Sequence, residues 1–134
     1  MIQIPSKIEG RHYSLYNLEQ SLKPKGFQIG GNWDYDHGSF DYKISDDEGY
    51  QFLRIPFTAV DGQLDSAGVT VKLGRPFLMN HVYQRGLDDY ASSGNLAASF
   101  NQFSEPQEKD AEFPEEYIQF GRQLVRDIES LLID

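Results

Sequence analysis

Residues 30–42 read GGNWDYDHGSFDY, and this stretch decides how the middle of the chain folds. It contains the only tryptophan of the chain, and aromatic and polar residues alternate along it. A period of two is typical of β-strands. We therefore expect strands near residues 27–35 and 39–45, joined by a tight turn at His37-Gly38, where glycine tolerates a left-handed backbone.

The register of this hairpin follows from the position of its turn. It pairs Tyr35 with Phe40 and Trp33 with Tyr42, which places aromatic side chains together on one face of the sheet. Because the next strand adds further apolar residues to the same face, we expect that face to be the core.

The opposite face of the same hairpin pairs Asp34 with Asp41, and like charges directly opposite each other are destabilising. The next turn, at residues 46–49, places Arg54 opposite Asp41. A guanidinium can bridge carboxylates through its planar fork, so we expect Asp41 and Arg54 to lie within ion-pair distance. The group Asp34–Asp41–Arg54 is either an exposed salt-bridge network or a polar patch that binds a ligand.

The remaining elements give the fold class. Ser14 is suited to cap a helix whose apolar residues recur at helical spacing, and a longer helix with an apolar stripe begins near Pro114. Further strands are expected near residues 8–13, 50–60, 69–73 and 77–83, with antiparallel neighbours because the connections are short. The order predicts a single α+β domain over residues 1–134. It has one curved antiparallel sheet of five or six strands, a short N-terminal helix and a long C-terminal helix, as in TATA-binding-protein or helix-grip topologies.

The composition restricts the classes of partner. The chain has 134 residues, 12 Lys and Arg against 21 Asp and Glu, a net charge of −9 and no cysteine. A negative field repels phosphate backbones and anionic lipid, so we expect neither nucleic-acid nor membrane binding. With no apolar run long enough to span a bilayer and no secretory signal, we expect a cytoplasmic protein.

The sequence carries few signals of chemistry. Asp34, Asp36 and His37 are metal-ligand types, but no second cluster has a ligand spacing, so we expect no metal and no cofactor. We also expect no catalytic residue, because no nucleophile motif is present. Gly30-Gly31 precedes a strand rather than a helix, which indicates a bulge or a close backbone approach and not a dinucleotide fingerprint.

Residues 86–112 show no sustained period, and a connection of this length is often functional. Two functions therefore stay open. The first is a non-enzymatic binding or protein-interaction module, with a homodimer through the exposed sheet as one form of it. The second is a small-molecule sensor or enzyme with a pocket near residues 86–112. The candidate ligand-binding residues are Asp34, Asp41, Arg54 and His81.

Several linked motifs carry a resemblance to a known family. They are residues 30–42, 53–57, 73–78, 81–83, 86–88 and 101–103. From about residue 7 to its end, the chain resembles the YugN-like family of small bacterial proteins, found mainly in Bacillus-type firmicutes. The resemblance implies a bacterial, cytosolic, single-domain α+β protein. This family has no assigned activity, substrate or cofactor, so the resemblance carries over no functional residues.

Overall fold

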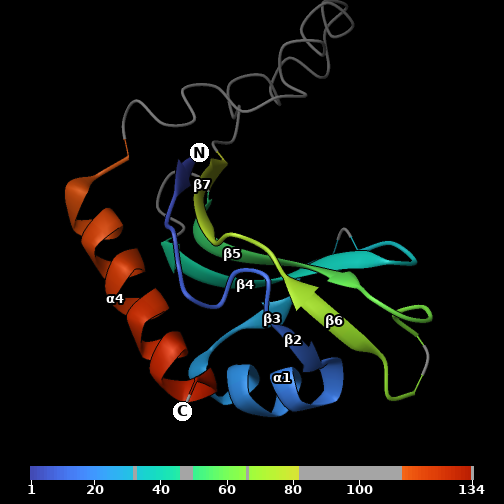
Figure 1. Cartoon of the computed structure of the whole chain (residues 1–134). Helices are drawn as coiled ribbons and strands as arrows, with labels where there is room; N and C mark the ends of the chain where they lie inside the picture. The colour runs from blue at the N-terminus through green and yellow to red at the C-terminus, as the bar shows by residue number, and fades with distance from the viewer. Residues whose placement is uncertain (32, 46–49, 66, 82–112, 134) are drawn as a thin grey trace, which may run out of the picture.

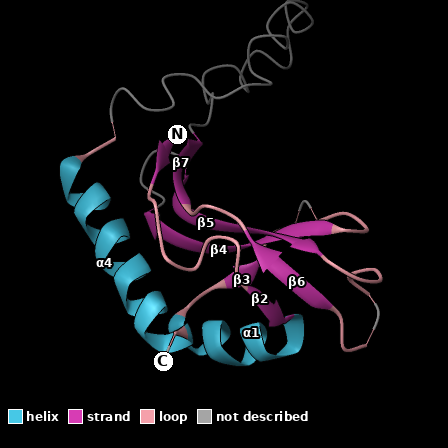
Figure 2. Cartoon of the chain, viewed as in Figure 1, coloured by secondary structure: helices cyan, strands magenta, loops and turns pink. Residues whose placement is uncertain are grey.

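The computed structural model describes residues 1–31, 33–45, 50–65, 67–81 and 113–133, and in them the chain forms one antiparallel sheet and two α-helices (Figure 1). The strands are β1 (Ile2–Gln3), β2 (His12–Ser14), β3 (Gln28–Ile29), β4 (His37–Ser45), β5 (Tyr50–Ala59), β6 (Thr70–Leu73) and β7 (Phe77–His81). The helices are α1 (Leu15–Leu22), followed by the 3₁₀ turn η1 (Lys23–Lys25), and α4 (Glu115–Leu132) (Figure 2). The predicted α+β class is confirmed. The described strands number seven rather than five or six, and the likeness to TATA-binding-protein or helix-grip topologies is not confirmed.

The strand β5 organises the sheet, because it pairs with β4 on one side and with both β7 and β6 on the other. The change of neighbour falls at Pro56, which has no N–H to donate to a ladder. The Pro56 carbonyl accepts a hydrogen bond from the Gly74 amide at 2.8 Å, in the connection between β6 and β7. Proline is therefore tolerated inside this strand because its missing donor faces the break between two neighbours.

Both helices pack on one face of the sheet, and their apolar side chains complete the core. Each fully buried Leu, Ile or Phe contributes about 1.5–3 kcal/mol relative to an exposed one. The core includes Leu18 and Leu22 of α1, Leu124, Val125 and Ile128 of α4, and Phe40, Leu53, Ile55, Phe57, Val71, Leu73 and Leu78 of the sheet.

The predicted first helix is confirmed together with its signals. The Ser14 hydroxyl accepts a hydrogen bond from the Asn17 amide at 3.0 Å, as expected of an N-cap. After η1 the chain turns at Gly26, whose φ of 110° is a left-handed conformation that favours glycine.

The apolar stripe of α4 is confirmed in part. Gly121, Leu124 and Ile128 are buried, whereas Phe120 and Leu131 are about 40% exposed. A Cβ atom at Gly121 would lie 2.8 Å from Leu78, so glycine lets this helix approach β7 closely.

The predicted hairpin at His37-Gly38 is wrong. His37 is the first residue of β4, and the short strand β3 pairs Gln28 with Asp41 and Ile29 with Phe40. Gly38 does not have a positive φ. A Cβ there would lie 3.0–3.1 Å from the Phe57 ring and from the Trp33 Cβ, so this glycine permits close packing rather than a turn.

Trp33 and Tyr35 consequently lie in the connection between β3 and β4 and not in the core. Their exposed fractions are 53% and 69%. The expected first strand near residues 8–13 is also shorter, because pairing with β6 begins only at His12.

The second hairpin has the predicted register over most of its length. Tyr42 pairs with Leu53 and Asp41 with Arg54, as expected. A bulge after Lys43 shifts the register at the end of the hairpin, so that Ser45 pairs with Gln51 rather than with Tyr50.

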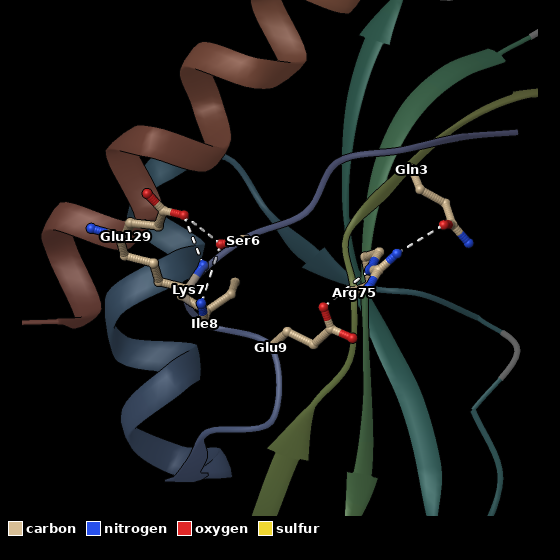
Figure 3. Close-up of polar contacts among 7 residues, drawn as sticks. All are labelled: Gln3, Ser6, Lys7, Ile8, Glu9, Arg75 and Glu129. Atoms are coloured by element: carbon tan, nitrogen blue, oxygen red, sulfur yellow. Dashed lines mark hydrogen bonds and ion pairs between the residues drawn. The ribbon is translucent and has the colours of Figure 1, made fainter.

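A carboxylate of α4 ties the last turns of this helix to the N-terminal segment (Figure 3). Glu129 Oε2 accepts hydrogen bonds from the Ser6 hydroxyl at 2.7 Å and from the Lys7 amide at 3.0 Å. The Ser6 oxygen in turn accepts from the Ile8 amide at 3.2 Å. The hydrogen bond from Ser6, followed by that from the Lys7 amide, lowers the pKa of Glu129 below its ordinary value of 4.5.

This tie predicts a pH-dependent contribution to stability. Because the pKa of Glu129 is lower in the folded than in the unfolded chain, its contribution is fully present above pH 4.5 and is lost as the pH falls through the folded pKa. We expect Glu129→Gln to lower the free energy of unfolding at neutral pH and to have a smaller effect in acid. Urea unfolding of both proteins from about pH 7 to about pH 3 measures this difference. Asp127→Asn, on the exposed side of the same helix, is the control, and an equal pH dependence in that variant would contradict the assignment.

Candidate functional site

The Asp41–Arg54 ion pair lies on the face of the sheet that neither helix covers. Arg54 Nε donates to Asp41 Oδ1 and Arg54 Nη2 to Asp41 Oδ2, each at 3.0 Å. The two side chains are 21–23% exposed. The predicted contact is confirmed, with the two-pronged geometry that guanidinium and carboxylate favour.

The neighbouring groups fix this pair in place. The Ser39 hydroxyl donates to Asp41 Oδ1 at 3.0 Å, and the Arg54 guanidinium lies 5.0 Å from the centre of the Phe52 ring, a cation–π distance. A Cβ at Gly30 would lie 2.7 Å from Asp41 Oδ2, so the glycine lets its backbone pack directly against this carboxylate.

Asp34 does not join this group. The residue opposite Asp41 on the far side of β4 is Gln28, and Asp34 Oδ1 accepts instead from the Tyr35 amide at 2.7 Å in its own loop. The outer face therefore carries an ion pair, not the predicted triad.

An open cleft of about 670 Å³ adjoins the ion pair. It is lined by Gly26, Gln28, Ile29, Gly30, Gly31, Asp41, Tyr42, Lys43 and Phe52. Its wall combines three polar residues, Gln28, Asp41 and Lys43, with two aromatic residues, Tyr42 and Phe52. Such a mixture suits a small molecule that has polar donors and a flat apolar part.

The part of this site that sequence reasoning missed is Phe52. The alternation that places Arg54 on the outer face places Phe52 there as well, because the two are separated by two positions on β5. Gln28 could not be found in the same way, because the expected pairing placed Asp34, and not Gln28, opposite Asp41.

The other predicted candidate, His81, is the last residue of β7, where its backbone pairs with Tyr50. Its side chain and residues 86–112 lie outside the described part of the chain, so the predicted pocket near them stays a prediction. Among the described residues, no three His, Asp or Glu side chains gather where they could hold a metal ion. No described helix is long and apolar enough to cross a membrane.

A double-mutant cycle tests whether the ion pair stabilises the fold. We expect Asp41→Ala and Arg54→Ala to be coupled by about 1–3 kcal/mol in the free energy of unfolding, because the pair is bidentate and shielded from water. The exposed Glu9–Arg75 pair, whose side chains are 39–44% exposed, is the comparison and should show coupling of about 0–1 kcal/mol. Equal coupling energies in the two cycles would contradict the prediction that the Asp41–Arg54 pair stabilises the fold more than the exposed pair does.

Comparison with known proteins gives the family of this chain. It is 49% identical over 133 residues to the uncharacterised protein YugN of Bacillus subtilis (strain 168), and the alignment covers 99% of each chain. It is 28% identical over 127 residues to the uncharacterised protein YlbA of the same organism, and that alignment covers 95% of this chain and 91% of YlbA. The crystal structure of YugN from Geobacillus kaustophilus HTA426 has a similar fold, with a TM-score of 0.73 at 21% identity over 98% of this chain and 95% of that one. The model of the YugN-like family matches residues 3–132. This chain belongs to the YugN-like family.

Proposed function

We propose that this protein is a non-enzymatic binding protein that holds a small polar molecule in the cleft beside Asp41. The observation that carries the proposal is the position of a fixed carboxylate in the wall of an open 670 Å³ cleft. Ligand sites commonly combine apolar surface with a few precisely placed polar groups.

The bonding of Asp41 favours recognition over proton transfer. Oδ1 accepts from both Arg54 and Ser39, and Oδ2 accepts from Arg54, so the carboxylate is held at a fixed orientation. A carboxylate has about four acceptor positions, which leaves capacity for an N–H or O–H group of a ligand. A rigid acceptor of this kind reduces the entropic cost of binding.

Two other residues of the lining contribute complementary contacts. Phe52 contributes apolar ring surface, and Gln28 offers an amide that both donates and accepts. The class of ligand that fits these groups, together with Lys43 in the same lining, is a neutral or zwitterionic molecule with a ring and at least one hydrogen-bond donor.

Gly31 allows a steric test that leaves the ion pair intact. It lines the cleft, a Cβ at this position would meet no atom within 4 Å, and its φ is not positive. Gly31→Phe should therefore fill the cleft with little strain, whereas Gly31→Ala should leave it open.

The experiment is a thermal-shift screen of the unsubstituted protein against nucleosides, amino acids and amines, followed by calorimetry. Ligand at about 100 times its Kd stabilises the fold by about 2.7 kcal/mol, which raises the melting temperature by several degrees. We expect a compound that stabilises the unsubstituted protein and Gly31→Ala, and that binds Gly31→Phe at least about tenfold more weakly. The proposal is wrong if every stabilising compound binds Gly31→Phe equally well.

A further inference from the structure

The only tryptophan of the chain, Trp33, lies on the surface with 53% of its area exposed, and Tyr35 beside it is 69% exposed. Large aromatic side chains contribute most to stability when buried, so two exposed rings in one loop indicate a surface that another molecule covers. Neither residue belongs to the cleft beside Asp41.

The loop that carries these rings is held by backbone hydrogen bonds. The Asp34 amide donates to the His37 carbonyl at 2.7 Å, and the Ala59 amide donates to the Asp36 carbonyl at 2.7 Å. The Leu64 amide donates to the Tyr35 carbonyl at 2.9 Å. The backbone of residues 34–36 is therefore tied to β4, to β5 and to the connection after β5, which lowers the entropic cost of binding a partner there.

The same surface is negatively charged. Asp34 and Asp36 belong to this loop, and Asp61 and Asp65 belong to the connection after β5 that is hydrogen-bonded to it. The sequence has no Lys or Arg between Lys25 and Lys43, or between Arg54 and Lys72. Both loops extend from the side of the sheet away from α4 (Figure 1).

We propose that this aromatic–acidic surface, formed by Trp33, Asp34, Tyr35, Asp36, Asp61 and Asp65, docks a basic segment of another protein. Lys and Arg side chains bind the faces of Trp and Tyr rings by cation–π attraction, and they donate strong hydrogen bonds to carboxylates. Trp and Tyr are also the residue types that most often dominate the energy of protein interfaces. A chain segment fits better than a single ammonium ion, because the carboxylates come from two separate loops.

Trp33 provides a direct readout, because all tryptophan fluorescence of the protein comes from this surface. The probe is a hexalysine or hexaarginine peptide, titrated at low salt, with hexaglutamate as the comparison. We expect a saturable change in Trp33 emission with the basic peptides alone, weakened by added salt.

Two double variants separate a local site from the general attraction of an acidic chain. Asp34→Asn/Asp36→Asn removes two charges but keeps side-chain oxygens that accept hydrogen bonds, so the loop should keep its conformation. Glu115→Gln/Glu116→Gln removes the same charge from the start of α4. We expect at least tenfold weaker binding in the first variant and less than twofold weakening in the second. Thermal unfolding of each variant establishes that it is folded.

Substitutions of Trp33 complete the test. Trp33→Ala, measured by calorimetry with the same peptides, should lose at least fivefold in affinity, and Trp33→Phe should lose less. Equal weakening in the two charge variants, or no saturable signal up to about 1 mM peptide, would overturn the proposal. So would competition by tetramethylammonium at the concentration of the peptide, because a single small cation would then be the better ligand.

Discussion

The pairing of β4 with β5 is the constraint on which the other features depend. Its register places Phe40, Leu53 and Ile55 beneath the helices, and it places Asp41 against Arg54 on the opposite face. A shift of one residue would exchange the two faces, because side chains alternate along a strand. The core, the ion pair and the wall of the cleft are therefore three consequences of one register.

The register was predictable over most of this hairpin because residues 46–49 are acidic or glycine and because Leu53, Ile55 and Phe57 recur at every second position of β5. The caps of α1 and the apolar stripe of α4 were predictable for the same kind of reason, since each depends on residues close together in sequence. The branching of the sheet at Pro56 could not be predicted in this way. It depends on which strand lies beside β5 at each point, and this information is distributed between β6, β7 and the connection that joins them.

The errors in the candidate site have one cause, which is the dual role of glycine. His37-Gly38 has the composition of a tight turn, but Gly38 lies within β4, where a Cβ would lie only 3.0–3.1 Å from Phe57 and Trp33. Once the turn is misplaced, alternation assigns Trp33 and Tyr35 to the core and Asp34 to the ion pair. The periodicity of aromatic residues cannot reveal the difference, because an exposed aromatic loop and a buried strand can share the same pattern.

The tie between Ser6 and Glu129 joins residues that are 123 positions apart in the chain. During synthesis on the ribosome the N-terminal segment emerges long before α4 exists, so its final partner is missing while the sheet is being made. Contacts of such separation carry the largest loop-closure entropy and tend to form late. Ser6 lies between Ile4 and Ile8, which are both buried in the finished core, so the segment that waits for its last partner is an apolar one, and exposed apolar segments are those that chaperones and proteases recognise.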